Sequence, residues 1–427
     1  MKINLRFLYV LPLLAVFLTD RALGEFVFGT EEVRPLELLF VYGLAGCSIL
    51  LVLSYYRRLE RMMQLWFWLV IGCVVGLCLE SYSGWGVWAK YPHVFSKFSV
   101  MLPLFGLYAY YRRYPAPSYR ILVAVIFPGL LLSLVVFHRD ALSLGSFLET
   151  ERGFSVTSAY LLLLIALFCL NWYLTQGHLL SGLSFLVAMA LIVFLQHRTV
   201  WVCSALALAL NLALLALRVP EAHQMGRRLT LLGTMSLVLG MSSGLAVVLD
   251  NPEVVRKFIA NFEDLQHPTT QGTGTFRMQQ HEAYVPLLEE RPLAGWRLEG
   301  FQVPIQMYDE AGDQVWPDFT GHHFHSFYLD RLFYFGIVGV LLVAFIPLFA
   351  LGRILLRLTP LSPDLVALLS FTSTFFVFGF SYDWPSYLYG VLGLMLAAVS
   401  YQLHSAPTAP LPGRLHRRPT AASPIPA

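Results

Sequence analysis

Apolar runs of membrane-spanning length recur along the whole chain and are separated mostly by short polar segments. A run of about 18 to 22 residues crosses roughly 30 Å of hydrocarbon, because a helix rises about 1.5 Å per residue. The pattern predicts an all-α, polytopic membrane protein with about twelve transmembrane helices. Their expected bounds are Phe7–Leu18, Leu36–Tyr55, Leu65–Ser83, Val100–Tyr111, Ile121–Phe137, Ser158–Leu174, Leu179–Leu195, Val200–Leu217, Leu229–Leu249, Phe327–Phe349, Leu365–Phe380 and Tyr387–Gln402.

A long polar, acidic segment interrupts this pattern between the ninth and tenth runs, from Asp250 to about Ser326. Connections of this length are usually functional or disordered. Its many aromatic and apolar side chains favour order, because a solvated tether seldom carries them. We therefore expect one large folded loop that is partly helical around Thr275–Glu290.

Composition agrees with the membrane class: 57% of the side chains are hydrophobic, 13% are charged, and the mean hydropathy is +0.63. Such values lie outside the range of soluble globular proteins, so the lipid bilayer is the expected surrounding. All five cysteines fall within apolar runs, so we expect neither a disulfide framework nor a thiolate zinc site. The small net charge of +3 gives no indication of nucleic-acid binding.

Positive charges gather in alternate loops. More than half of the 29 Lys and Arg residues lie in one set of loops and in the two termini, whereas most acidic residues lie in or beside the opposite loops. The positive-inside rule then places both termini in the cytoplasm and the long loop outside it. The expected organisation is nine spans in 1–249, the loop in 250–326, three spans in 327–403, and a disordered cytoplasmic tail in 404–427.

The first run has an alternative interpretation as a cleaved signal peptide, because Arg21–Gly24 loosely resembles a signal-peptidase site. Asp20 and Arg21 crowd that site, and cleavage would break the even helix count. We therefore expect the first run to be retained as a span.

Arg198, Arg277 and the histidine cluster stand apart from the cytoplasmic basic residues. Arg198 lies at the outer junction of two runs, where it either snorkels to the interface or lines an aqueous path. Arg277 lies at the start of the expected loop helix, and alone it would be a surface salt-bridge partner. His322, His323 and His325 open the tenth span. A metal site is one interpretation, but no Cys or His-Glu-x-x-His pattern accompanies them, and placement at the headgroup level is another.

Taken together, these residues resemble the signature of the O-antigen ligase and polymerase superfamily. His325–Leu329 (His-Ser-Phe-Tyr-Leu) and Gly336–Gly339 (Gly-Ile-Val-Gly) resemble its His-Asn-x-x-Leu and Gly-x-x-Gly elements. Arg277 followed by Arg291–Gly295 (Arg-Pro-Leu-Ala-Gly) is similar to the start of its large periplasmic loop, and Arg198 to its arginine at the outer end of a middle helix. The resemblance implies a GT-C-like glycosyltransferase fold.

The resemblance further implies transfer of a glycan from undecaprenyl diphosphate to an acceptor hydroxyl in the periplasm, with inversion and without a metal or other cofactor. The enzyme would be a multi-pass protein of the bacterial inner membrane with its active site facing the periplasm. Arg198 and Arg277 would clamp the leaving diphosphate, since a guanidinium pairs bidentately with phosphate oxygens. His325 would act as the general base or, alternatively, would orient phosphate or acceptor. His323 and Asp383 are weaker candidates for a supporting role.

Three departures affect the subfamily rather than the superfamily: Ser326 replaces the usual Asn, His281 a frequent Trp, and Arg297 a frequent second loop Gly. A single large outer loop favours an O-antigen ligase, which joins the polysaccharide to the lipid A-core oligosaccharide. An O-antigen polymerase commonly has two substantial outer loops, and protein-glycosylating relatives are longer at the C-terminus. A secondary transporter is the alternative from another class, because it shares the twelve-helix layout, but the chain shows no convincing internal repeat.

Overall fold

The computed structural model describes residues 8–31, 35–149, 153–241, 251–266, 273–308, 313–314, 321–357 and 359–405. The structure is about 80% helical. The described residues form no β-strand, and their β-type pairing is an isolated bridge between Tyr308 and Gln314. The all-α class expected from the hydrophobic pattern is confirmed. The tail expected in 404–427 lies almost entirely outside the described residues.

Seven helices among the described residues are long and apolar enough to cross a membrane. They are α3 (Pro35–Tyr55), α4 (Arg61–Trp85), α7 (Tyr119–Val136), α9 (Val156–Gln176), α11 (Arg198–Arg218), α16 (Phe327–Leu356) and α19 (Ser386–Ser405). Two shorter apolar segments accompany them, namely α10 (Leu179–Phe194) and the pair α17 (Pro363–Ser373) and α18 (Phe375–Phe378). These helices indicate a membrane protein.

Several expected spans are shorter helices in the structure. The first run contains α1 (Leu11–Phe17), and the fourth contains α6 (Leu102–Arg113), which at 12 residues reaches only about 18 Å. The ninth contains α12 (Met225–Leu239), beyond which 242–250 lie outside the described residues. The number twelve and the GT-C-like topology therefore remain predictions.

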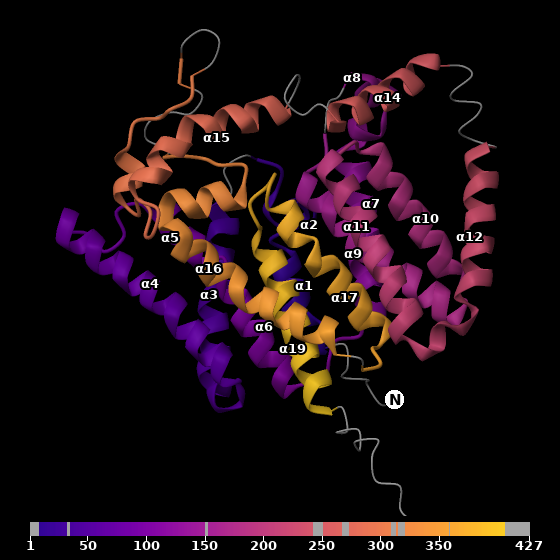
Figure 1. The fold of residues 1–427 in the computed structure, drawn as a ribbon, viewed down its shortest axis with the longest axis horizontal. Coiled ribbons are helices and arrows are strands. Elements are labelled where there is room, and N and C mark those ends of the chain that lie inside the picture. Colours follow the sequence, from indigo (N-terminus) through magenta and orange to yellow (C-terminus); the bar gives the residue numbers. More distant parts are fainter. Residues whose placement is uncertain are drawn as a thin grey trace, which may run out of the picture.

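The remaining helices are short or lie outside the apolar bundle. The loop helix expected around Thr275–Glu290 is present as α15, and it lies across one end of the bundle (Figure 1). Its bounds are Thr273–Glu290. The others are α2 (Arg21–Phe28), α5 (Pro92–Ser99), α8 (Leu144–Glu149), α14 (Pro252–Gln266) and four 3₁₀ turns, η2 (Tyr56–Arg58), η3 (Arg139–Leu142), η4 (Pro220–Gln224) and η6 (Glu299–Gln302).

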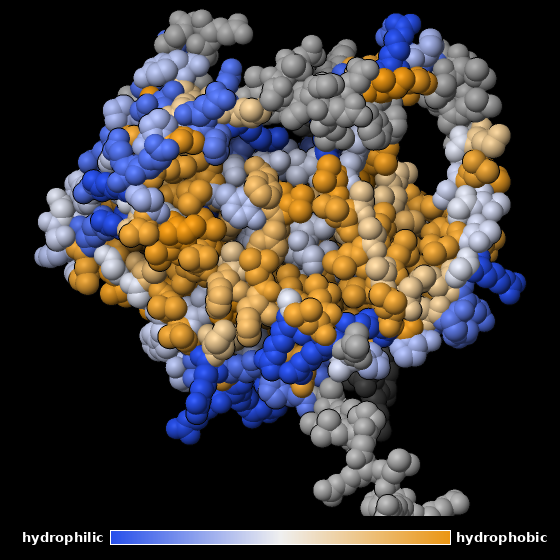
Figure 2. Space-filling view, in the orientation of Figure 1, coloured by the Kyte–Doolittle hydropathy of each residue, from blue (hydrophilic) through white to orange (hydrophobic). Residues whose placement is uncertain are grey.

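Helix α9 forms the centre of the bundle. Every side chain from Ser158 to Thr175 is buried, and the helix packs against α7, α10, α11 and α17 (Figure 1). Two buried amides, Asn171 and Asn211, exchange hydrogen bonds between α9 and α11 at 2.6 and 3.1 Å. By contrast α3 and α4 expose leucines along much of their length, and Figure 2 shows an apolar band across the middle of the molecule with polar residues on both sides of it. This is the surface expected of a protein that lies in a bilayer.

Helix α16 is broken at Gly336, which has φ +61° and ψ −162°. The break separates the amides of Ile337 and Val338 from the carbonyls one turn earlier, those of Phe333 and Tyr334. A loop segment, 292–297, inserts its backbone at this point. Ile337 and Val338 donate to the Pro292 and Leu293 carbonyls at 2.8 and 3.2 Å. The Phe333 and Tyr334 carbonyls accept from the Trp296 and Arg297 amides, both at 2.8 Å.

Both sides of this exchange need a residue with little bulk or a positive φ. A Cβ on Gly336 would lie 2.4 Å from the Leu293 carbonyl, and one on Gly295 would lie 2.4 Å from the Phe335 nitrogen. Arg297 is a non-glycine residue with a positive φ, +48°. Its guanidinium donates to Glu80 on α4 at 2.8 Å, an ion pair that helps to hold this unusual conformation.

We predict that Gly336→Ala destabilises the protein, because the new methyl group combines backbone strain with a collision against fixed carbonyl atoms. The cost should be about 1–3 kcal/mol, typical of overpacked sites. Gly352→Ala is the control in the same helix, since a Cβ there meets nothing within 4 Å. Thermal unfolding of both variants in detergent would measure the difference, and equal melting temperatures would show that the break needs no glycine.

Candidate functional site

The histidine cluster lies in a short extended segment, Gly321–Ser326, between the loop and the start of α16. Side chains alternate sides along an extended chain. His322 and Phe324 are buried, whereas His323 and His325 are exposed on the opposite side. The alternation separates one structural histidine from two that are accessible to a substrate.

His322 is held by hydrogen bonds on both ring nitrogens. Its Nε2 lies 2.8 Å from the Val303 carbonyl oxygen, to which it donates, and its Nδ1 accepts from the Tyr284 hydroxyl at 2.7 Å. Burial raises the pKa of Tyr284 to about 12, so this hydroxyl keeps its proton. The imidazole of His322 is therefore engaged through both ring nitrogens in the packing of the loop. The neighbouring Gln280 amide donates to the His323 carbonyl at 2.9 Å, so α15 positions the whole segment.

Ser326 is the N-cap residue of α16. Its hydroxyl accepts from the Leu329 amide at 3.4 Å and lies 3.2 Å from the Gly379 carbonyl oxygen. Serine is among the preferred N-cap residues because its side-chain oxygen satisfies a free amide of the first helical turn. The Phe327 amide also donates to the Gly379 carbonyl at 2.9 Å, which joins the histidine segment to the turn after α18.

His325 lies beside Phe276 and Arg277 on α15. The ring centroids of Phe276 and His325 are 5.7 Å apart. Desolvation, followed by the Arg277 guanidinium and His323, lowers the pKa of His325 below its ordinary value. The imidazole is therefore neutral at neutral pH and has a nitrogen lone pair that can accept a proton.

Arg277 places its guanidinium over the ring of Tyr382, with the guanidinium carbon 4.9 Å from the centroid. Its Nε is buried and has no hydrogen-bond partner among the described residues. Nor does Arg277 form an ion pair with a described residue, in contrast to the surface salt bridge that a loop arginine usually makes. A fixed cation with a desolvated, unsatisfied donor is suited to binding an anion.

Two cations and two carboxylates, Lys97, Asp330, Arg331 and Asp383, form a cluster that is buried except at Asp383. The Lys97 ammonium bonds Asp330 at 2.6 Å, and Arg331 forms an ion pair with the same carboxylate. Asp383 lies 3.5 Å from Arg331 and 4.0 Å from Lys97. The side chains of Asp330 and Arg331 are fully buried, so mutual pairing is what makes their charges tolerable there.

Asp383 connects the buried cluster to the exposed residues. Asp383 follows Tyr382, whose ring lies under the Arg277 guanidinium. The Asp383 carboxylate accepts a hydrogen bond from the Trp384 amide at 2.8 Å. On the other side, His93 of α5 lies 4.9 Å from the His323 ring. Burial, Lys97 and His323 lower the pKa of His93 to about 3, so it is neutral. Arg277, His323, His325 and Asp383 are thus linked through direct neighbours, whereas the supporting roles of His323 and Asp383 remain predictions.

Arg198 is the first residue of α11 and is half-buried. The preceding junction is fixed to the segment around α8, because Gln196 donates to the Phe147 carbonyl at 2.6 Å and the His197 ring lies 3.0 Å from the Phe154 carbonyl oxygen. Further along α11, Cys203 contacts the Thr374 carbonyl just before α18. Since the two helices run in opposite directions, Arg198 lies towards the end of the bundle that carries Tyr382. That Arg198 and His325 act on the same bound substrate remains a prediction.

Sequence reasoning missed Lys97, His93, Asp330 and Arg331. Asp330 and Arg331 fall inside the expected tenth span, and ionisable residues within a span are by default functional or paired. That signal was available, whereas nothing local identifies Lys97 as their partner. Among the described residues, no group of three or more His, Cys, Asp or Glu is arranged to hold a metal ion.

We predict that replacing one member of the Lys97–Asp330 pair destabilises the protein more than replacing both. Lys97→Met or Asp330→Asn alone leaves an unmatched buried charge and should cost about 3–5 kcal/mol. The double variant leaves Arg331 and Asp383 matched and should recover a large part of that loss. Thermal unfolding of the three variants gives the coupling, and losses that simply add would contradict the proposed pairing.

No family model matches the chain, and no curated protein matches it.

Proposed function

We propose that this protein is a membrane glycosyltransferase that moves a glycan from a polyprenyl diphosphate carrier to an acceptor hydroxyl. The observation that carries the proposal is that His325, whose pKa is lowered, lies near the Arg277 guanidinium of α15, whose Nε is buried without a hydrogen-bond partner among the described residues. The resemblance of the same residues to the O-antigen ligase and polymerase superfamily points to the same chemistry.

The proposed reaction needs a proton acceptor and a stabiliser of the leaving group. The acceptor hydroxyl attacks the anomeric carbon as the bond from that carbon to the diphosphate oxygen breaks. The hydroxyl proton passes to His325, and the diphosphate leaves with the bonding electron pair. Arg277, with Arg198 as the second candidate, stabilises the charge that accumulates on the diphosphate oxygens. Because attack comes from the face opposite the leaving group, the configuration inverts.

The single large outer loop favours O-antigen ligase over O-antigen polymerase as the specific activity. In this proposal the donor is O-antigen on undecaprenyl diphosphate, and the acceptor is the lipid A-core oligosaccharide. The protein would lie in a bacterial inner membrane, with α15 and His325 facing the periplasm and the arginine-rich helix ends facing the cytoplasm. No metal or cofactor enters the proposed reaction, since fixed guanidinium groups supply the positive charge.

A transfer assay tests this function directly. Purified protein in liposomes would receive the lipid-linked glycan and the lipid A-core acceptor. A joined product in the presence of chelator is expected. Longer carrier-linked glycan that forms without acceptor would indicate a polymerase, and solute movement without any transfer would indicate a transporter.

In that assay we predict that His325→Ala lowers the transfer rate by about 10²–10⁴-fold, the range for loss of a general base. His325 is exposed, so its removal should leave the melting temperature nearly unchanged. His404→Ala is the control, because its side chain is 63% exposed at the end of α19 and it should transfer normally. A His325→Ala protein with near-normal turnover would exclude the base.

We further predict that the transfer rate falls as the pH is lowered below 6.5. A base acts only when unprotonated, and the lowered pKa of His325 keeps it unprotonated to lower pH than an ordinary histidine. Activity should therefore hold from neutral pH down to about 6.5 and fall only below it. Arg277→Lys should be slower, because it loses bidentate geometry, yet should keep the same pH dependence because it keeps the charge. A transfer rate of the wild-type protein that already falls at or above pH 6.5 would contradict the assignment of His325 as the general base.

A further inference from the structure

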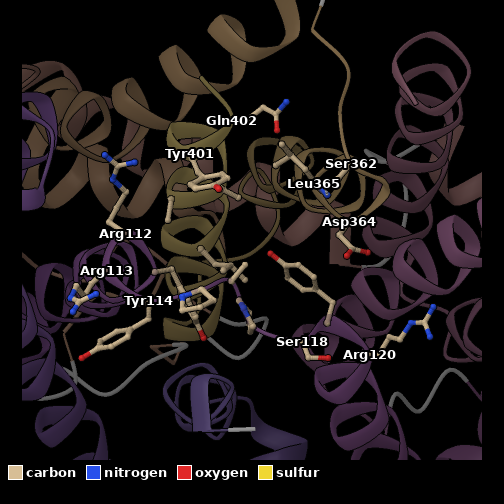
Figure 3. A pocket seen from close by; sticks show the side chains of 18 of the residues that line it. Arg112, Arg113, Tyr114, Ser118, Arg120, Ser362, Asp364, Leu365, Tyr401 and Gln402 are labelled. Carbon is tan, nitrogen blue, oxygen red and sulfur yellow. Dashed lines mark hydrogen bonds between the residues drawn. The ribbon is translucent and has the colours of Figure 1, made fainter. Parts of the chain in front are cut away.

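A cavity with a partly charged lining lies at the opposite end of the bundle from α15, where α6, α9 and α19 end and α7 and α17 begin (Figure 3). Its volume is about 940 Å³, within the range of sites that hold a small organic molecule and far more than a water-filled crevice needs. The turn from Tyr111 to Arg120 forms much of its wall.

Charges line this cavity unequally. Arg112 and Arg113 lie on one side of it, and Arg120 and Asp364 lie on the other (Figure 3). Asp364 is the one carboxylate among the lining residues, against three guanidinium groups. The excess of positive charge is therefore concentrated on the side of Arg112 and Arg113.

The interactions of these groups show which of them are engaged. Asp364 accepts from the Trp172 indole at 2.7 Å, and Arg120 donates to Gln176 while lying over the Trp172 ring. Arg113 lies over the Tyr114 ring at 5.1 Å. The Nε of Arg112 is buried and lacks a hydrogen-bond partner among the described residues. Neither Arg112 nor Arg113 forms an ion pair with a described residue.

Next to these charges the lining becomes apolar. Leu394, Ala397 and Ala398 of α19 and Leu365 of α17 complete the cavity. The cavity lies at the level where the span-length helices α7, α9 and α19 begin or end, which is the level of the lipid headgroups. A ligand with one anionic and one apolar part matches such a lining.

We propose that this cavity binds a phosphate-ester anion through Arg112 and Arg113. Guanidinium groups pair with phosphate oxygens in a planar fork, and basic pockets between transmembrane helices are suited to anionic headgroups. The phosphate is carried by an anionic phospholipid or by a small soluble phosphate ester. The site is separate from the proposed glycan transfer, so its test stands whether or not that activity is found.

Native mass spectrometry of the full-length protein tests the proposal. Phosphatidylglycerol and phosphatidylcholine with the same acyl chains would be added in parallel to the wild type. We expect stronger retention of phosphatidylglycerol and a loss of that retention of about tenfold or more in Arg112→Gln/Arg113→Gln, because two headgroup cations are removed. Arg112→Lys/Arg113→Lys keeps the charge and should retain part of the binding, which guards against a variant that fails to fold.

Arg57→Gln/Arg58→Gln is the matched control. These two arginines are also adjacent, are exposed and lie outside the cavity, and their change removes the same charge. The control should bind phosphatidylglycerol like the wild type. Equal losses in the two Gln variants, or equal retention of the two lipids without binding of a soluble phosphate, would overturn the proposal.

Further samples with inorganic phosphate and with glycerol 3-phosphate distinguish the two sources. Retention of phosphatidylglycerol alone, lost in the Arg112/Arg113 variant, would assign the site to a lipid headgroup. Retention or competition by a soluble phosphate, lost in the same variant, would assign it to a small ester. Binding of neither class would remove the site.

Discussion

A backbone amide inside a membrane-embedded helix must find an acceptor within the protein, because hydrocarbon offers none. Helix α16 breaks at Gly336 and so loses two of its internal hydrogen bonds. The loop segment 292–297 replaces both, giving two carbonyls to α16 and taking two in return. The break is therefore tolerable only while the loop is docked. This exchange anchors the loop to the bundle, and the placement of α15 and of the histidine segment depends on it.

Docking has a direct consequence for the candidate site. α15 ends at Glu290, immediately before the docked segment, so its last turn is fixed at the break, where the Trp296 indole donates to the Leu287 carbonyl at 2.8 Å. Further back along α15, Tyr284 and Gln280 hold the segment that carries His325. Arg277 is one turn beyond Gln280 and so lies beside His325. The order of the motifs along the chain thus corresponds to a chain of contacts in space.

The hydrophobic pattern predicts much of this arrangement and leaves a definite part undetermined. Apolar period and length gave the helical class and the start of α16 at Phe327, because these depend on local sequence. The helix α15 was also expected, within a loop whose aromatic and apolar side chains favour order. The pairing of Lys97 with Asp330, which are 233 residues apart, depends on how helices pack and has no local signal. The role of His322 also escaped prediction, since three adjacent histidines differ only in which side of an extended segment they occupy. The number of spans is weakly determined because short helices such as α6 share the composition of long ones.

The arginines of this chain differ in whether a carboxylate neutralises their charge, and this difference decides whether they can bind an anion. Arg331 is fully buried and compensated by Asp330 and Asp383, so its charge stabilises the packing of α16 and is not available to an incoming anion. Arg277 is held by an aromatic ring, which orients the guanidinium without neutralising it. Fixed orientation with uncompensated charge is what transition-state stabilisation requires, because the donors then need no reorganisation as charge develops. Arg120 and Arg112 differ in the same way: Arg120 is engaged near Asp364, whereas the Arg112 Nε has no hydrogen-bond partner among the described residues, and this difference singles out the cavity that both line. Both proposals of a phosphate site therefore rest on the lack of a carboxylate partner among the described residues, rather than on the presence of arginine alone.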